Sequence, residues 1–466
     1  MNFEAVVGLE LHIQMKTKSK MFSSAPVTFG SEPNTETVPF DLAFPGTMPV
    51  VNKQAVINAI RVCHALHMRI DDELWFDRKN YFYSDLPKGY QITQERRPIG
   101  SNGYLDINSQ RIGVERLHIE EDTCKQVHFK DHTLLDYNRA GIPLVEIVTK
   151  PEIQSGEEAM RFVEKIRSIV SFLGVSDGKM EQGSLRCDVN VSIRPIGSQR
   201  FGTKVEIKNI NTLANIQRAI DYEIKRQVCI LLSGGEVKQE TRRFDERKKE
   251  TVLMRDKTDI VDYKCFTETN IPPIKLSSEF INDVINSSPE LAEVKCQRYK
   301  KLGLNDKDWE QLTADKDISE YFDEMINSCA DPKLSANWII VDVQTILNKQ
   351  NISIREFPIK PETLAELIKL IQNEKVYNKQ ARDIFNKMLK DNIDPRSLVD
   401  INELTEEQIM EIVNRVINAN PKSVIDYKNG KDKALGFLVG KVFKETNNKA
   451  NPDKISKLVI KELKVR

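Results

Sequence analysis

Polar and apolar residues alternate with a period of two through much of the first 290 or so residues. Near the amino terminus, one side of the predicted strand carries Phe3, Ala5, Val7, Leu9, Leu11, Ile13 and Met15. The other side carries Glu4, Glu10, His12, Gln14 and Lys16. Because successive side chains of a strand point to opposite faces, this pattern predicts a strand with one buried face and one ionisable face.

A second alternating segment predicts a β-hairpin. Residues 185–193 place Leu185, Cys187 and Val189 on one face, with Arg186 and Asp188 on the other. The chain breaks at Pro195 and resumes the alternation over residues 204–208. We therefore predict an antiparallel sheet in which one face is apolar and the other carries acids and bases.

Helical periodicity interrupts this sheet and then replaces it. Residues 54–67, 156–173 and 212–232 have helical patterns, and beyond about residue 290 the period is 3.6 with few strand signals. Capping boxes predict helix starts at Thr363, with Glu366, and at Thr405, with Gln408. Further amphipathic helices are predicted around residues 381–389, 435–443 and 455–463.

These patterns predict an α+β protein. A mostly antiparallel sheet domain with helices, residues 1–290, would hold the chemistry. An all-α helical domain would follow over residues 291–397, and a small helical tail over residues 398–466. A chain of 466 residues is too long for a single small binding module.

Charge is balanced overall but not locally. The 69 Lys and Arg equal the 69 Asp and Glu, so a nucleic-acid surface would have to be a local patch. The segment 421–466 holds twelve Lys or Arg and five Asp or Glu. A basic helical tail suits contacts with phosphates, and a solvated lysine-rich surface is an equally good interpretation of this feature alone.

Composition also sets expectations about location. No run approaches the 18 apolar residues that a membrane span needs, so no membrane association is expected. Seven cysteines are widely spaced with no C-x-x-C pair, which favours neither a disulfide framework nor a cysteine zinc site. We expect a reducing compartment such as the cytoplasm.

The candidate chemistry lies on the ionisable face. Glu10 and His12 share one side of a strand, and an acidic cluster follows His118 at Glu120, Glu121 and Asp122. Asp188 and Asn190 add oxygen donors, and the cations that would bind phosphate are Arg78, Lys79, Lys204 and Lys208. Oxygen-rich ligands with one imidazole favour Mg²⁺ or Mn²⁺. The chain has neither a P-loop sequence nor a G-x-G-x-x-G fingerprint. If ATP is used, it would therefore lie across the sheet face. Each cluster alone is also typical of a polar sheet edge that faces water.

Long ordered segments resemble the B subunit of the aspartyl/glutamyl-tRNA amidotransferases. These segments are Val7-Gly-Leu-Glu-Leu-His12, Phe76-Asp-Arg-Lys-Asn-Tyr-Phe-Tyr83, Leu117-His-Ile-Glu-Glu-Asp122, Pro143-Leu-Val-Glu-Ile-Val148, Gly183-Ser-Leu-Arg-Cys-Asp-Val-Asn190 and Phe201-Gly-Thr-Lys-Val-Glu-Ile-Lys-Asn209. The resemblance spans essentially the whole chain. The chain departs from the usual family pattern at Thr123-Cys124, at Glu181-Gln182 and over residues 266–270.

The resemblance implies an ATP-dependent ligase. Its substrate would be Glu-tRNA(Gln), Asp-tRNA(Asn) or both, whose side-chain carboxylate is phosphorylated by ATP with Mg²⁺ and then aminated. Ammonia would come from an amidase-type A subunit, assisted by a small C subunit in a heterotrimer. The basic tail would bind the tRNA by its shape and backbone.

The resemblance also implies roles for individual residues. The implied catalytic set is Glu10, His12, Lys79, Glu120, Glu121 and Asp188. Within it, Glu10, His12 and Glu121 would be the metal ligands, and Lys79 would face phosphate. Neighbouring residues of a strand point to opposite faces, so Glu120 and Glu121 cannot be equal ligands without a bulge. The family motif favours Glu121 as the ligand. Glu120 is favoured by its position two residues after His118, which places both side chains on the same face of the strand.

Two other interpretations remain open at this stage. The chain could be a degenerate, non-catalytic tRNA-binding adaptor, against which the presence of Glu10, His12, Glu121 and Asp188 argues. It could also be a free-standing ligase that aminates a small carboxylic acid, although that role gives no purpose to a basic tail.

Overall fold

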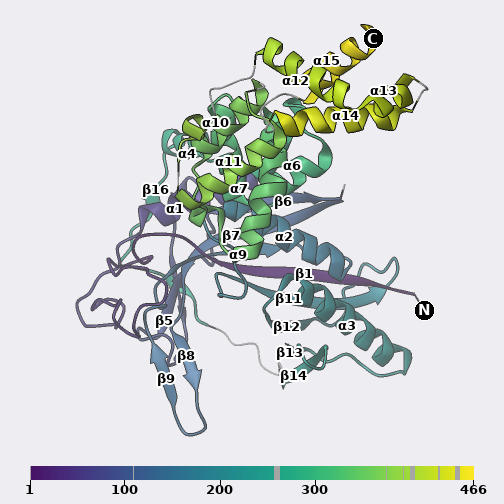
Figure 1. The fold of residues 1–466 in the computed structure, drawn as a ribbon. Helices are drawn as coiled ribbons and strands as arrows, with labels where there is room; N and C mark the ends of the chain where they lie inside the picture. Colours follow the sequence, from purple (N-terminus) through teal and green to yellow (C-terminus); the bar gives the residue numbers. More distant parts are fainter. Residues whose placement is uncertain are drawn as a thin grey trace. The chain divides into compact units, whose positions relative to one another are not determined.

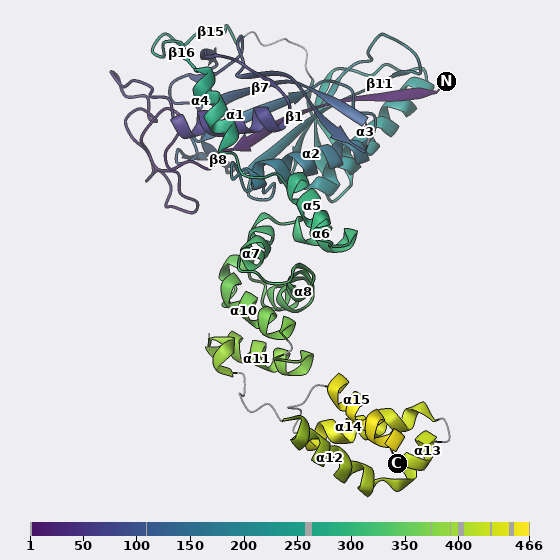
Figure 2. The ribbon, with the colours of Figure 1, turned by 90° about the horizontal axis from the view of Figure 1, so that it is seen from above.

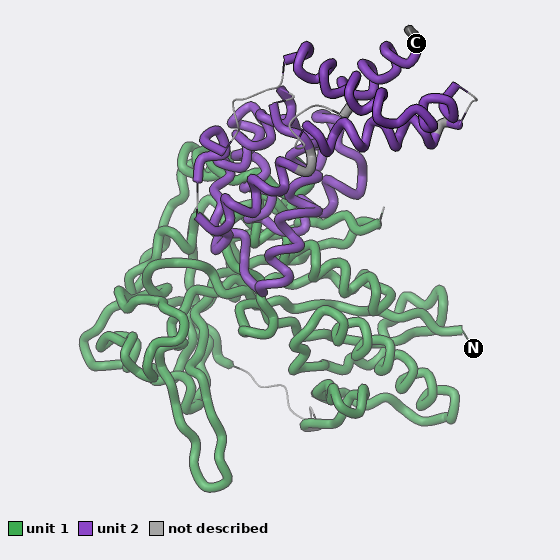
Figure 3. The backbone as a smooth tube through the Cα atoms, in the orientation of Figure 1, with its two compact units in different colours: residues 1–295 green, residues 296–466 purple. Residues whose placement is uncertain are grey.

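The computed structural model describes residues 2–108, 110–256, 263–373, 375–391, 393–398, 405–428, 431–446 and 452–465. The chain divides into unit 1, residues 1–295, and unit 2, residues 296–466 (Figure 3). The division falls within helix α5 (Ala292–Lys301), close to the predicted boundary after residue 290. The second predicted boundary, before residue 398, borders residues 399–404, which lie outside the described residues.

A nine-stranded sheet forms the centre of unit 1 (Figure 1). In spatial order its strands are β14 (Glu250–Asp256), β13 (Glu240–Asp245), β12 (Val205–Ile210), β11 (Leu185–Pro195), β1 (Phe3–Gln14), β10 (Pro143–Thr149), β7 (Gln110–Glu121), β6 (Gly100–Ile107) and β2 (Arg69–Ile70). Neighbouring strands are antiparallel except for β12 and β13. The predicted hairpin is confirmed, because Asn190 of β11 pairs with Glu206 of β12.

Three helices pack on the apolar side of this sheet, as Figure 2 shows. They are α1 (Lys53–Ala65), α2 (Gly156–Phe172) and α3 (Leu213–Leu232), within a few residues of the predicted ranges. Leu9 and Leu11 of β1 share one buried cluster with Ile60, Phe162 and Ile216 of the helices. Because burial of this face stabilises unit 1, the alternate residues of β1 are left on the opposite, ionisable face.

Smaller elements complete unit 1. They are the three-stranded sheet of β15 (Phe266–Thr267), β4 (Asp77–Asn80) and β5 (Tyr90–Thr93), the pair β3 (Glu73–Leu74) and β16 (Ile274–Lys275), the hairpin β8 (Lys125–His128) and β9 (Thr133–Asp136), and helix α4 (Ser278–Asn286). Strand β5 contacts the end of β7, and it therefore borders the ionisable face.

In the described part of unit 2, every regular element is a helix. After α5 these are α6 (Asp306–Leu312), α7 (Lys316–Asn327), α8 (Pro332–Asn337), the π-helical η1 (Trp338–Val343), α9 (Gln344–Gln350), the short 3₁₀ turns η2 (Ile354–Glu356) and η3 (Pro395–Leu398), α10 (Pro361–Gln372), α11 (Asn378–Asp391), α12 (Glu406–Ala419), α13 (Pro421–Lys428), α14 (Asp432–Glu445) and α15 (Pro452–Val465). They form two apolar clusters, one over residues 299–388 and one over residues 409–463. The predicted α+β class is confirmed.

The two predicted capping boxes have different outcomes. The box at Thr405 is confirmed, since its hydroxyl accepts from the Gln408 amide and the Gln408 side chain accepts from the Thr405 amide. The box at Thr363 is wrong, because α10 already begins at Pro361 with Lys360 as its N-cap. Proline has no amide hydrogen to satisfy and fits the first helical position, so it moves the start of α10 to Pro361.

Among the described residues, no helix is long and apolar enough to cross a membrane.

Candidate functional site

One row of side chains crosses four neighbouring strands on the ionisable face. His118 of β7 lies opposite Glu146 of β10, and Glu146 lies opposite His12 of β1. On the other side His12 pairs in register with Arg186 of β11. Glu120 follows His118 by two residues on the same strand, so it points to the same face. The sheet register therefore gathers residues that are far apart in sequence.

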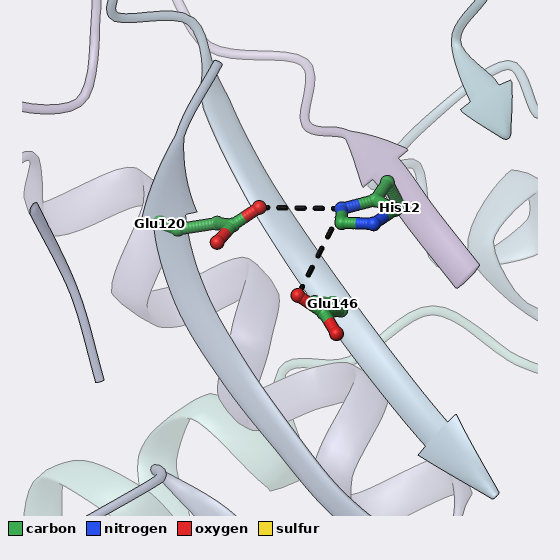
Figure 4. A group of neighbouring side chains, drawn as sticks. All are labelled: His12, Glu120 and Glu146. Carbon is green, nitrogen blue, oxygen red and sulfur yellow. Dashed lines mark hydrogen bonds and ion pairs between the residues drawn. The ribbon is translucent and has the colours of Figure 1, made fainter. Parts of the chain in front are cut away.

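His12, Glu120 and Glu146 point toward one another (Figure 4). His12 Nδ1 lies 3.2 Å from Glu120 Oε1 and 3.9 Å from Glu146 Oε2. One ligand atom from each of the three side chains lies within 4.8 Å of the others. The Glu120 side chain is only 4% exposed, whereas that of His12 is 24% exposed and is the most accessible of the three.

Each ionised group in this cluster is supported by its neighbours. Burial by itself would lower the pKa of His12, but the hydrogen bond to Glu120 and the charge of Glu146 outweigh it, so the pKa is raised. Burial would likewise lower the pKa of His118, yet Glu146 and Glu120 raise it to about 10. Burial would raise the pKa of Glu120 and Glu146, but the two imidazoles lower both values. Each imidazole thus favours the ionised form of the two carboxylates, and each carboxylate favours the protonated form of the imidazoles.

The donors of this cluster fit a divalent cation. Two carboxylates and one imidazole converge from three strands, and hard ions such as Mg²⁺ and Mn²⁺ prefer such oxygen-rich ligands. A histidine binds a metal through an unprotonated ring nitrogen, so a cation and a proton compete for His12.

A second group of charges lies beside the first on the same face. Glu10 and Asp188 are directly opposite in the β1–β11 register. Glu10 accepts a 2.9 Å hydrogen bond from Asn190, and Lys208 Nζ lies 2.8 Å from Asp188 Oδ2. Burial would lower the pKa of Lys208, but Asp188 and Glu206 outweigh it and raise the pKa. The structure thus brings Glu10, Asp188 and Lys208 together. Glu10 is hydrogen-bonded to Asn190, and in the described residues it is not part of the group around His12.

Glu121 takes part in a different set of contacts. Its carboxylate lies 2.9 Å from Lys88 Nζ and accepts a 3.0 Å hydrogen bond from the amide of Ile92 on β5. Strand β7 keeps its register with β10 from Leu117 through Glu121, so no bulge turns Glu121 toward His12. The sequence predicted Glu10, His12 and Glu121 as the metal ligands. The structure groups His12 with Glu120 and Glu146 instead.

The predicted phosphate-binding cations are also placed individually. Arg78 is held by Glu268 at 2.6 and 2.9 Å, and its guanidinium lies 4.2 Å from the centre of the Tyr90 ring. The Lys79 ammonium lies 4.9 Å from the Tyr263 ring centre. Lys204 is exposed just before β12. Lys208 alone among them contacts, in the described residues, a predicted site acid.

Sequence reasoning missed Glu146 and gave His118 no role of its own. Glu146 was readable only as the single charge in the apolar run 143–148, and a charge on a buried strand needs a partner. Arg186 was assigned to the ionisable face without a role, and it pairs with Asp122 at 2.9 Å.

The comparisons with known proteins cover the chain almost from end to end. Residues 5–282 match the family described as the GatB/GatE catalytic domain, and residues 320–463 match the GatB domain. The chain belongs to the GatB family. Curated relatives named as the B subunit of aspartyl/glutamyl-tRNA(Asn/Gln) amidotransferase occur in Geobacillus thermodenitrificans, 46% identical over 100% of both chains, and in Geobacillus kaustophilus, 46% identical over 99% of both. Another GatB relative, from Ligilactobacillus salivarius, is 43% identical over 100% of both chains.

In this GatB chain, all three residues of the candidate metal group lie inside the segment that matches the catalytic domain. Most of unit 2 falls within the segment that matches the second domain.

Proposed function

We propose that this chain is the carboxylate-activating component of a glutamine-dependent tRNA amidotransferase. Its substrates would be Glu-tRNA(Gln), Asp-tRNA(Asn) or both, with ATP as the phosphoryl donor. The names of full-length relatives support the amidotransferase role. The observation that carries the assignment of chemistry to this chain is the convergence of His12, Glu120 and Glu146 on one sheet face.

The reaction requires an activated carboxylate. A carboxylate is a poor electrophile, so one of its oxygens first attacks the γ-phosphorus of ATP and releases ADP. Ammonia then attacks the carbonyl carbon of the acyl phosphate, loses a proton, and expels phosphate to leave the amide. Both steps bring anions together, and alignment and neutralisation of those anions are what a protein can supply.

Side chains of the sheet face would supply part of that neutralisation. His12, Glu120 and Glu146 would hold Mg²⁺, which when bound would offset charge on phosphate oxygens. Arg186 and Lys208 flank this group on β11 and β12, where their own acids, Asp122 and Asp188, fix their positions. These paired cations would orient the polyphosphate or the acyl group, and Lys79 would approach phosphate from β4.

The partners follow from the chemistry that we assign. Ammonia would be supplied by an amidase-type A subunit with a small C subunit. The tRNA would be bound by unit 2, where residues 421–466 hold twelve Lys or Arg and five Asp or Glu. Such a surface suits backbone contacts with RNA.

The test is transamidation by the chain co-expressed with its A and C partners. Glu-tRNA(Gln) and Asp-tRNA(Asn) are supplied separately with ATP, Mg²⁺ and either glutamine or ammonium chloride. We expect amide product with both nitrogen sources and none with His12→Ala, whereas the exposed-histidine control His64→Ala on α1 stays active.

The same assay separates the proposal from an adaptor role. Absence of product and of ATP turnover in the parent complex, together with normal tRNA binding, would contradict the catalytic proposal and favour the adaptor.

A further inference from the structure

We propose that His118 is a positioning residue that fixes the two carboxylates of the candidate metal group. This inference rests on the proposed metal site and adds to it a residue outside the ligand set. His118 lies on β7 with its side chain only 4% exposed, next to both Glu120 and Glu146.

The contacts of His118 define this role. Its Nε2 atom lies 3.2 Å from Glu146 Oε2 and 3.4 Å from Glu120 Oε2. Ionised carboxylates only accept hydrogen bonds, so Nε2 carries the hydrogen and donates to one or both. His118 thereby links β7 to β10 through the two acids that would bind the cation.

The two imidazoles divide the oxygens of Glu120 between them. Oε1 faces His12 Nδ1 at 3.2 Å, and Oε2 faces His118 Nε2 at 3.4 Å. Thr93 of β5 also lies 3.4 Å from Oε2. Because His118 and Thr93 both contact Oε2, Oε1 is the oxygen that faces His12, where it would bind a cation.

Burial distinguishes His118 from His12. The 24% exposed His12 side chain is accessible to a ligand, whereas the His118 side chain is only 4% exposed, and its Nδ1 atom is buried without a hydrogen-bond partner among the described residues. Burying a ring nitrogen without a hydrogen-bond partner costs free energy, and contacts made by the other nitrogen must offset that cost. The two contacts to Glu120 and Glu146 are that compensation.

The experiment compares Mn²⁺ binding by full-length variants. His118→Leu fills the buried volume without a donor, and His118→Asn moves the donor closer to the backbone. His118→Gln supplies an N–H near the position of Nε2. His64→Gln on the exposed face of α1 is the matched control. Mn²⁺ affinity is measured by electron paramagnetic resonance, and circular dichroism verifies folding.

We expect His118→Leu and His118→Asn to weaken Mn²⁺ binding about 10- to 100-fold, the range for removing a residue that orients metal ligands. His118→Gln should remain within about threefold of the parent. Electron spin echo modulation from a bound ¹⁴N should persist in the His118 variants and disappear in His12→Ala, because His12 and not His118 is the ligand.

Other results overturn the proposal in distinguishable ways. Unchanged affinity in a folded His118→Leu protein shows that His118 positions nothing. Equal loss in His118→Gln and His118→Leu contradicts a donor role. Loss of the ¹⁴N signal in His118→Leu with its retention in His12→Ala makes His118 the ligand. Failure of the parent to bind Mn²⁺ overturns the metal site, and the positioning role with it.

Discussion

Units 1 and 2 differ in whether they bury charged side chains. Unit 1 buries many charged side chains. Three of its buried ionisable residues, His118, Glu120 and Glu121, lie at the end of the single strand β7. Among the described residues of unit 2, the buried polar side chains are hydroxyls, namely Thr313, Ser319, Ser335 and Thr446. Since an unpaired buried charge is strongly destabilising, every charge inside unit 1 needs a partner.

This contrast separates packing from chemistry. The helices of unit 2 present apolar stripes inward and charges outward, which folding alone explains. The buried charges of the unit 1 sheet do not stabilise its apolar core. Ionisable groups with perturbed pKa values that are buried in this way are candidates for function. If this contrast is correct, substitutions in unit 1 should change metal binding and substitutions in unit 2 should change stability alone.

The largest effect should come from the candidate ligands. We expect Glu120→Gln to lower transamidation on the order of 10²–10³-fold, the range for loss of one preorganised electrostatic group, and to weaken Mn²⁺ binding in parallel. The matched variant Glu121→Gln should keep Mn²⁺ affinity within about threefold, because Glu121 contacts Lys88 and Ile92 instead. The opposite ranking of the two variants in a Mn²⁺ titration would return Glu121 to the ligand set.

A core substitution in unit 2 should affect stability without affecting the metal site. Phe322 is fully buried and packs edge-on against Tyr299 at 4.8 Å. Phe322→Ala should destabilise this cluster by about 3–5 kcal/mol. Hydrogen exchange should then increase in α7, while Mn²⁺ affinity of unit 1 stays at the parental value. Phe162→Ala, in the core of unit 1, is the reciprocal control and should lower protection around the sheet.

Metal binding should stabilise unit 1 selectively. At Mn²⁺ concentrations about 100 times its dissociation constant, mass action adds about 2.7 kcal/mol to the state that binds it. Amide protection should rise in β1, β7 and β10 and stay constant in the helices over residues 299–388. Chelation should reverse the gain, and equal protection of both units would contradict a site confined to the sheet.

Proton competition should make this binding depend on pH. Despite burial, the pKa of His12 is raised by the hydrogen bond to Glu120 and the charge of Glu146, so a proton competes with the cation up to a higher pH than at an ordinary imidazole. Affinity should therefore rise with pH until His12 is deprotonated, at most about tenfold per pH unit for one displaced proton. Glu120 and Glu146, whose pKa values are lowered, stay ionised over the same range. Titrations of Mn²⁺ at several pH values measure the slope, and a flat profile would remove His12 from the ligands.

The smallest effect should come from a helix cap. Thr405→Ala removes the side-chain acceptor of the capping box and should destabilise α12 by about 1 kcal/mol. Thr363→Ala lies inside α10, whose start is at Pro361, and should change stability by less than about 0.5 kcal/mol. Equal effects in thermal unfolding would mean that Thr363 caps a helix after all.

Local patterns were sufficient wherever the deciding contacts are local. The alternation of β1, the helices of unit 1 and the Thr405 box each depend on residues a few positions apart, and the hairpin of β11 and β12 joins strands that are consecutive in the chain. Pro361 shows the limit even there, because two overlapping start signals compete and the proline at the first helical position prevails.

The sequence by itself determined that β1 has an ionisable face, that Glu10 and His12 share it, and that helices follow the sheet. Only the tertiary structure decided that Glu146 and Glu120 meet His12, while Glu121 turns to Lys88. The physical reason is register: β1 lies between β10 and β11, which begin at Pro143 and Leu185, and one residue of slip would send every side chain of a strand to the other face. The sequence shows which residues of a strand share a face, but which strands become neighbours depends on the packing of the whole unit.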